Sequence, residues 1–186
     1  MITNVEGDLP PLLFVHIPKT GGIAIRSQLR EQPWLRTWHI GHDPYHVLKL
    51  NNNITPEVFK FSVVRNPFTR AYSYYHHFLR FNQIQISFKN FLSMIMVGEV
   101  TEKTPLMKYD QSFYIFEEDI TEMDKIYRYE ELWELEVDLN IRIPKINVGS
   151  YSKEEYNNDY DSESVDMVRK IYARDFRNLG YSDEFS

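Results

Sequence analysis

The stretch Pro18–Gly22, with the sequence PKTGG, carries residues suited to binding an anion. It follows a short apolar run and precedes a plausible helix, where the first backbone N–H groups have no helical partner and the helix dipole is positive. Gly21 and Gly22 let the backbone come close to a phosphate, and Lys19 adds a full positive charge. A purely structural turn with a solvent-facing lysine is the alternative for these five residues.

The order of these residues differs from that of a nucleotide triphosphatase loop. In the Walker A pattern the lysine follows the glycines, whereas Lys19 precedes Gly21 and Gly22. A triphosphatase also needs a carboxylate near its magnesium ion, and the next expected strand, Phe59–Val64, ends in Arg65 instead. The sequence therefore predicts a pocket that neutralises anionic groups with side chains and without a metal ion.

A second group of polar residues lies in Val63–Phe78, with the sequence VVRNPFTRAYSYYHHF. Arg65 stands at the end of the expected strand, and Pro67 suits the first turn of a following helix. Arg70 and Ser73 are three residues apart, so they share a helix face. The guanidinium of Arg65 and the hydroxyl of Ser73 are suited to holding one phosphate. For each arginine alone, the alternative is a surface ion pair.

Together the two segments resemble the sulfotransferases that use 3′-phosphoadenosine-5′-phosphosulfate (PAPS), in particular the carbohydrate-type sulfotransferase family 2. Pro18–Gly22 looks like the 5′-phosphosulfate loop of that family, and Val63–Phe78 looks like its 3′-phosphate motif. The resemblance implies a three-layer, P-loop-like α/β fold. Weaker similarities to other blocks of the family occur in GHDPYHVLK (Gly41–Lys49), YDQSFYIF (Tyr109–Phe116), IYRYEEL (Ile126–Leu132), KINVGSY (Lys145–Tyr151) and IYARDFRNLGY (Ile171–Tyr181).

The resemblance implies an enzyme that transfers a sulfuryl group from PAPS to an acceptor hydroxyl, expected to belong to a sugar. Lys19 would act in catalysis by stabilising the charge that develops on the leaving 5′-phosphate. Arg65 and Ser73 would hold the 3′-phosphate. The backbone N–H groups that would assist at the 5′ end belong to Thr20, Gly21 and Gly22.

One departure from the family's pattern follows the two glycines. The family usually has a hydroxyl residue there, whereas this chain has Ile23 and Ala24, so a side-chain bond to the 5′-phosphate is lost. An alternative function is therefore a non-catalytic protein of the same fold that binds PAPS or adenosine 3′,5′-bisphosphate. Arg70 is a secondary candidate for the nucleotide and equally suits bracing the loop through a carboxylate.

The acceptor hydroxyl needs a general base, and histidine has the unperturbed pKa suited to that task. The resemblance assigns this role to His42, with His39 and His46 as the runners-up. The other histidines are expected in the core for His16 and on the surface for His76 and His77.

The spacing of His39, His42 and His46 also suggests a zinc site as a competing interpretation. The H-E-x-x-H pattern is absent, however, and Pro44 interrupts any single helix through the three histidines. The sequence therefore predicts no metal site. A nucleotide kinase on a related fold is a third hypothesis, which magnesium dependence would distinguish, and the failed Walker pattern disfavours it.

The hydrophobic pattern predicts short buried strands at Leu12–Ile17, Phe59–Val64 and Asp124–Tyr129. Helices are expected at Gly22–Arg30, Pro44–Leu50, Pro67–Phe81, Ser87–Val97, in the charged stretch after Tyr129, and from Asp161 or Ser162 up to Gly180. Strands that alternate with helices predict an α/β layer fold with a mostly parallel central sheet. The length predicts a single domain over residues 1–186.

The charge of the chain is unevenly distributed. The net charge is −6, yet residues 1–90 carry 10 Lys and Arg against 5 Asp and Glu, and residues 91–186 carry 11 against 22. An acidic protein is poorly suited to nucleic acid, which needs a broad positive surface, but a basic half suits a small anion. The absence of cysteine excludes disulfides and thiolate sites. Without a long apolar run or a signal-peptide layout, we expect no membrane partner and a cytoplasmic location.

Overall fold

The computed structural model describes residues 11–31, 41–99, 109–146, 149 and 151–185. The chain forms two compact units, each assembled from two separate segments. The sheet unit comprises Met1–Arg65 and Phe113–Asn147, and the helical unit comprises Asn66–Ser112 and Val148–Ser186. A single domain over residues 1–186 stays a prediction.

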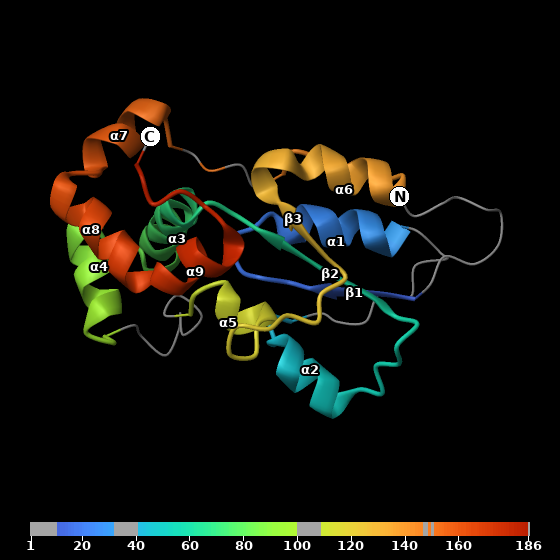
Figure 1. Ribbon diagram of the computed structural model, residues 1–186. Helices are drawn as coiled ribbons and strands as arrows, with labels where there is room; N and C mark the ends of the chain where they lie inside the picture. The colour runs from blue at the N-terminus through green and yellow to red at the C-terminus, as the bar shows by residue number, and fades with distance from the viewer. Residues whose placement is uncertain (1–10, 32–40, 100–108, 147–148, 150, 186) are drawn as a thin grey trace. The chain divides into compact units, whose positions relative to one another are not determined.

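The sheet unit is built on three parallel strands in the order β1-β2-β3 (Figure 1). They are β1 (Leu12–Val15), β2 (Phe59–Val64) and β3 (Lys125–Arg128). All four residues of β1 and the last four of β2 are buried, which is typical of strands covered on both faces. The sequence therefore predicted the position of all three strands, and that of β2 to the residue.

Helices cover both faces of this sheet. Helices α1 (Gly22–Glu31) and α6 (Leu132–Leu139) lie on one side, and α2 (Tyr45–Asn51) lies on the other (Figure 1). The short elements η2 (Tyr129–Glu131) and α5 (Ser112–Ile115) complete the connections. The core beneath α1 and α6 consists of Leu12, Phe14, Ile25, Leu29, Phe61, Val63, Tyr127, Leu135, Leu139 and Ile141. This three-layer arrangement confirms the predicted α/β fold class.

Parallel strands bring their carboxyl ends to one edge of the sheet, the usual place for ligands in such folds. The register pairs Val15 with Ser62 and Val64 with Arg128. The segments that follow the three strands therefore start from the same edge. They contain the Pro18–Gly22 loop after β1 and Arg65 after β2.

The helical unit contains α3 (Pro67–Asn82), α4 (Phe88–Met96), α7 (Lys153–Asp159), α8 (Ser162–Ile171) and α9 (Ala173–Leu179). The side chain of Asn66 caps α3 by accepting from the backbone N–H of Phe68 at 2.9 Å, and Pro67 occupies the first turn. The predicted helix from Pro67 is therefore confirmed, and it ends one residue later than expected.

The C-terminal region differs from the prediction. A single helix was expected up to Gly180, but the backbone of Tyr172 (φ −114°, ψ 27°) separates α8 from α9. Tyr172 and Asp175, on either side of this break, are both fully buried. The predicted start at Asp161 and stop at Gly180 are confirmed, since Asp161 caps α8 and Gly180 has a left-handed backbone. The segment before α8 contains α7, a helix that the sequence did not predict, which begins with a capping box of Ser152 and Glu155.

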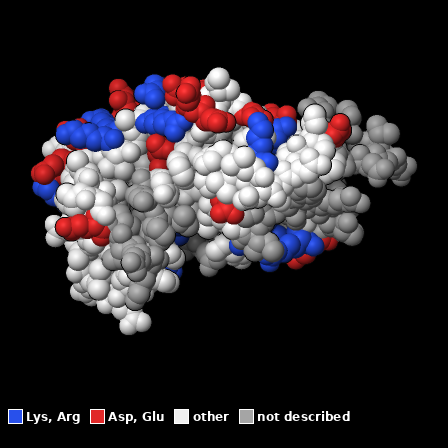
Figure 2. Space-filling view, turned by 90° about the horizontal axis from the view of Figure 1, so that it is seen from below, with Lys and Arg blue, Asp and Glu red and all other residues white. Residues whose placement is uncertain are grey.

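The outer surface carries interspersed charges. On the face shown in Figure 2, basic and acidic side chains lie next to one another. Exposed charges of opposite sign also form ion pairs, for example Arg169 with Asp166, where Nη1 lies 2.9 Å from Oδ1. That face therefore presents mixed charges rather than the broad positive surface typical of nucleic-acid binding. In the part of the chain that the structure describes, no helix has the length and apolar character needed to cross a membrane.

Candidate functional site

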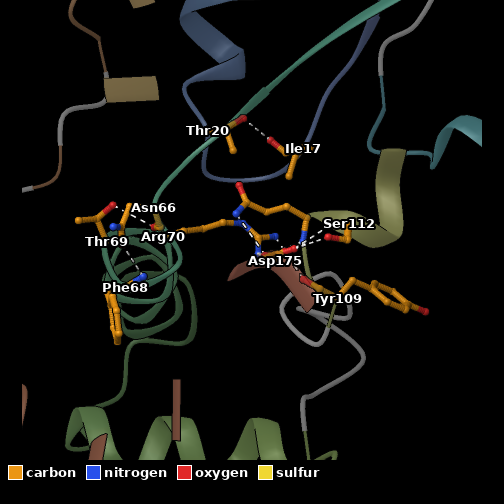
Figure 3. A network of polar contacts seen from close by, with 10 residues as sticks. Ile17, Thr20, Asn66, Phe68, Thr69, Arg70, Tyr109, Ser112 and Asp175 are labelled. Carbon is orange, nitrogen blue, oxygen red and sulfur yellow. Dashed lines mark hydrogen bonds and ion pairs between the residues drawn. The ribbon is translucent and has the colours of Figure 1, made fainter. Parts of the chain in front are cut away.

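The loop between β1 and α1 has an unusual backbone. Lys19 (φ 70°) and Gly21 (φ 82°) both adopt left-handed conformations, which a lysine rarely occupies. The fully buried hydroxyl of Thr20 donates to the carbonyl of Ile17 at 2.9 Å and fixes the turn (Figure 3). Backbone that turns in this way before a ten-residue helix directs N–H groups toward an anion site. Strain of this kind is concentrated at functional sites.

Both glycines of the loop are required by close contacts. A Cβ at Gly21 would lie 3.0 Å from Cε2 of Tyr129, and its positive φ also favours glycine. A Cβ at Gly22 would lie only 1.9 Å from Cδ2 of His16, whose ring is 4% exposed. The glycines therefore let the loop pack directly against the rings of His16 and Tyr129, which directly follow β1 and β3.

We expect Gly22→Ala to destabilise the protein by about 1–3 kcal/mol, because the buried ring of His16 has to move to admit the methyl group. Urea unfolding followed by circular dichroism measures this loss. The matched control is Ile23→Ala, one residue further along, since Ile23 is 53% exposed and its truncation should change stability by less than about 0.5 kcal/mol. Equal stabilities of the two variants would contradict the close contact with His16.

Arg65 reaches the loop from the end of β2. Its Nη1 donates to the carbonyl of Lys19 at 3.4 Å, a long hydrogen bond, and its Cζ lies 4.5 Å above the centre of the Tyr129 ring. Cation–π contact and hydrogen bond together orient the guanidinium. The structure thus brings Lys19 and Arg65 together at the carboxyl edge of the sheet unit.

Tyr129 is a residue that the sequence reasoning missed. Its ring contacts both Gly21 and Arg65, so it supports the loop and the arginine at once. The available signal was its position directly after β3, in the block Ile126–Leu132 that resembles the sulfotransferase family. Parallel strands place such a residue at the same edge as Lys19 and Arg65.

His42 lies beside the end of β1. Its Nδ1 is 3.0 Å from the carbonyl oxygen of His16, and the two rings are 4.1 Å apart. Because a carbonyl only accepts, Nδ1 of His42 carries the proton in this hydrogen bond, and Nε2 carries the lone pair of the neutral ring. His16 is buried, as predicted. Of the runners-up, His46 is exposed on α2, and His39 lies outside the described residues.

The helical unit holds the other predicted residues. Ser73 is half-buried on α3, and its pairing with Arg65 on one phosphate stays a prediction. The alternative of a surface ion pair does not apply to Arg70, which is fully buried. Its Nη2 donates to the carbonyl of Tyr109 at 3.2 Å, and its Nη1 lies 3.9 Å from the carboxylate of Asp175 (Figure 3). Arg70 thus lies beside a buried carboxylate, while its expected bracing of the nucleotide loop stays a prediction.

The expectation of a surface position is wrong for His76. Its ring stacks on Tyr151, with centroids 4.7 Å apart, and meets the ring of Tyr72 edge-on at 4.6 Å. This burial lowers the pKa of His76, since the charged form loses hydration. His77 is half-buried and stacks on Phe81. Helical position alone did not reveal the aromatic cluster that surrounds His76.

The suggested zinc site comprises His39, His42 and His46. Within the residues that the structure describes, no group of three His, Asp or Glu side chains is arranged to hold a metal ion. His39, a member of the suggested zinc site, falls outside them. Asn147 of the segment Lys145–Tyr151 also falls outside them.

Comparison with known proteins supports the fold. No protein-family model and no curated protein matches the sequence. Among solved structures, the chain is similar to the crystal structure of a sulfotransferase from Alicyclobacillus acidocaldarius, with a TM-score of 0.50 and 14% sequence identity. The match covers 93% of this chain and 95% of that chain. At this identity the likeness shows a shared α/β fold.

Proposed function

We propose that this protein is a sulfotransferase that moves a sulfuryl group from PAPS to an acceptor hydroxyl, with a sugar as the acceptor. The observation that carries the proposal is the hydrogen bond from Arg65 to the backbone carbonyl of Lys19, because it brings the guanidinium to the loop that carries Lys19, at the carboxyl edge of a parallel sheet. The similarity of the fold to a sulfotransferase supports the same function.

The residues at this edge fit an anionic donor. Lys19 and the loop N–H groups would hold the 5′-phosphosulfate, since a helix start and a cation both favour negative charge. Arg65 and Ser73 would hold the 3′-phosphate through a guanidinium and a hydroxyl. The ring of Tyr129 beneath Arg65 would keep the guanidinium in place before the donor binds.

The reaction requires one bond to form and one to break at sulfur. The acceptor oxygen forms a bond to sulfur as the bond from sulfur to the bridging oxygen breaks. The electron pair of the broken bond stays on the 5′-phosphate of adenosine 3′,5′-bisphosphate, where Lys19 would stabilise it. The proton of the acceptor hydroxyl passes to His42 and then to solvent. No redox change occurs.

The contact of His42 with the β1 end supports its role as the base. Since Nδ1 donates to the carbonyl of His16, the ring is oriented with Nε2 as the proton acceptor. A carbonyl partner fixes the tautomer in this way in many histidine sites. His42 would therefore be a general base of defined orientation.

We expect His42→Ala to lower sulfuryl transfer by about 10²–10⁴-fold, the usual contribution of a general base. The measurement uses radiolabelled PAPS with a panel of glycan acceptors. Calorimetric titration with adenosine 3′,5′-bisphosphate should give unchanged affinity for this variant and weakened affinity for Arg65→Ala. His77→Ala, a histidine on α3 that takes no part in the proposed mechanism, is the matched control. Full turnover by the His42 variant would remove His42 from the mechanism.

A non-catalytic nucleotide-binding protein is the second candidate. Ile23 favours it, because this apolar side chain is half exposed where the family has a hydroxyl residue. The same two measurements distinguish the candidates. Tight binding of the bisphosphate without transfer to any acceptor would support a binding protein, whereas transfer supports the enzyme.

A further inference from the structure

A cavity of about 290 Å³ lies in the sheet unit, lined by α2, α5 and the turn that follows α5. Its volume corresponds to on the order of ten water molecules, which suits a single sugar ring. The residues that line it are Tyr45, His46, Tyr114, Ile115, Phe116, Glu117, Glu118, Ile120 and Glu122.

The walls of this cavity are held by hydrogen bonds. Glu117 and Ile120 exchange backbone hydrogen bonds of 2.9 and 3.0 Å across the turn. The hydroxyl of Tyr45 donates to the carboxylate of Glu122 at 3.0 Å, and Lys49 donates to the same carboxylate. Burial, together with the bond to Glu122, raises the pKa of Tyr45 to about 12, so its hydroxyl stays protonated and keeps donating.

The cavity lies close to the proposed base. His46, which lines it, is four residues from His42, and four residues span at most about 14 Å when fully extended. His42 itself is anchored at the end of β1 by its bond to the carbonyl of His16. His42 does not itself line the cavity, so an acceptor bound there has to extend from the cavity to Nε2 of His42.

The lining combines aromatic rings with carboxylates. The rings of Tyr45, Tyr114 and Phe116 offer apolar faces of the kind that stack on sugars. Three carboxylates, those of Glu117, Glu118 and Glu122, give the cavity a negative charge. Lys49 pairs with Glu122 and lies outside the lining. The charges therefore favour a cationic occupant over an anionic one.

We propose that this cavity binds the acceptor, and that the acceptor is a cationic sugar, that is, an amino sugar. The proposal rests on the sulfotransferase function proposed above. The transfer step is unchanged: a sugar hydroxyl oxygen bonds to sulfur, the bridging bond breaks with its electron pair on the 5′-phosphate, and the hydroxyl proton passes to His42. The ammonium group of the sugar takes no part in the chemistry and is held by the glutamates.

Three sugars that share one ring and differ in charge test the proposal: glucosamine, glucose and glucuronate. With radiolabelled PAPS at saturation, we expect glucosamine to have the lowest KM and glucuronate the highest. In the double variant E117Q/E118Q, the KM for glucosamine should rise roughly three- to tenfold, as expected for two exposed ion pairs, while that for glucose stays unchanged. The matched control is Asp119→Asn, on the same turn but outside the cavity lining.

The outcomes separate this proposal from the function on which it rests. Transfer that favours glucuronate, or a glucosamine KM equally sensitive to Asp119→Asn, overturns the cationic acceptor and leaves the sulfotransferase intact. Saturation-transfer NMR with glucosamine and no donor provides a second measurement. If glucosamine shows neither binding nor turnover, the proposal fails, whereas loss of bisphosphate binding by calorimetry would reject the sulfotransferase itself.

Discussion

Replacing Lys19 by alanine is expected to reduce the turnover number for sulfuryl transfer by about 10²–10³-fold, the loss seen when one preorganised charge-stabilising donor is removed. The ammonium group of Lys19 would stabilise the bridging oxygen of the 5′-phosphate as negative charge develops on it. Its loss is therefore expected to raise the free energy of the transition state. Because alanine also has a Cβ, the strain of the backbone at φ 70° is the same in both proteins. Turnover at saturating PAPS should therefore fall without a change in unfolding midpoint.

The variant Lys19→Gly separates the catalytic effect of the ammonium group from the backbone strain at this position. Glycine adopts a left-handed backbone freely, so this variant should be more stable than Lys19→Ala by about 1 kcal/mol in urea unfolding. It should be as inactive as the alanine variant, because both lack the ammonium group. Arg30→Ala removes one exposed cation from the last turn of α1 and is the charge control. If it lowers turnover as much as Lys19→Ala, Lys19 acts only through the general field of the protein.

The sheet could be predicted from the sequence because its strands depend on local composition. Leu12–Val15 and Phe59–Val64 are short continuous apolar runs, which is the pattern of strands buried on both faces. The start of α3 could also be predicted, since Pro67 is a strong start signal. These elements follow from interactions between residues that are near one another in the sequence.

Features that depend on distant contacts could not be predicted. The backbone at Tyr172 breaks the helix, although the helical periodicity of the segment continues through it. Nothing in the sequence of α3 shows that His76 stacks on Tyr151. Contacts between side chains that are far apart in the sequence determine such features, so local sequence patterns do not predict them.

The candidate site could be predicted in part from the sequence. Lys19, Gly21 and Gly22 are adjacent in the sequence, and their types alone suggested an anion loop. Arg65 followed from the rule that parallel strands end at one edge. The ring that supports both belongs to Tyr129, which lies 64 residues after Arg65 in the sequence. Its contact depends on the strand order, which only the structure provides.

Asp175→Ala is expected to lower the free energy of unfolding by about 3–5 kcal/mol, the loss typical of removing one partner of a buried ion pair. Asp175 and Arg70 are both fully buried, with Nη1 of Arg70 3.9 Å from the carboxylate. The carboxylate also accepts from the backbone N–H groups of Gln111 and Ser112, at 2.9 and 2.8 Å, and from the Ser112 hydroxyl at 3.0 Å. Alanine would leave these buried donors without that acceptor.

Two further variants show whether the loss arises from charge or from hydrogen bonds. Asp175→Asn keeps the shape and one acceptor oxygen, so it should lie between the native protein and Asp175→Ala in urea unfolding followed by circular dichroism. Asp166→Ala breaks an exposed ion pair with Arg169 in the same unit and should cost less than about 1 kcal/mol. A loss for Asp175→Ala no larger than this control would mean that Arg70 is held by its contacts with Tyr109 and the neighbouring rings rather than by the carboxylate. The buried charge of Arg70 makes the larger loss the expected one, since a guanidinium without its counter-charge is costly to keep from water.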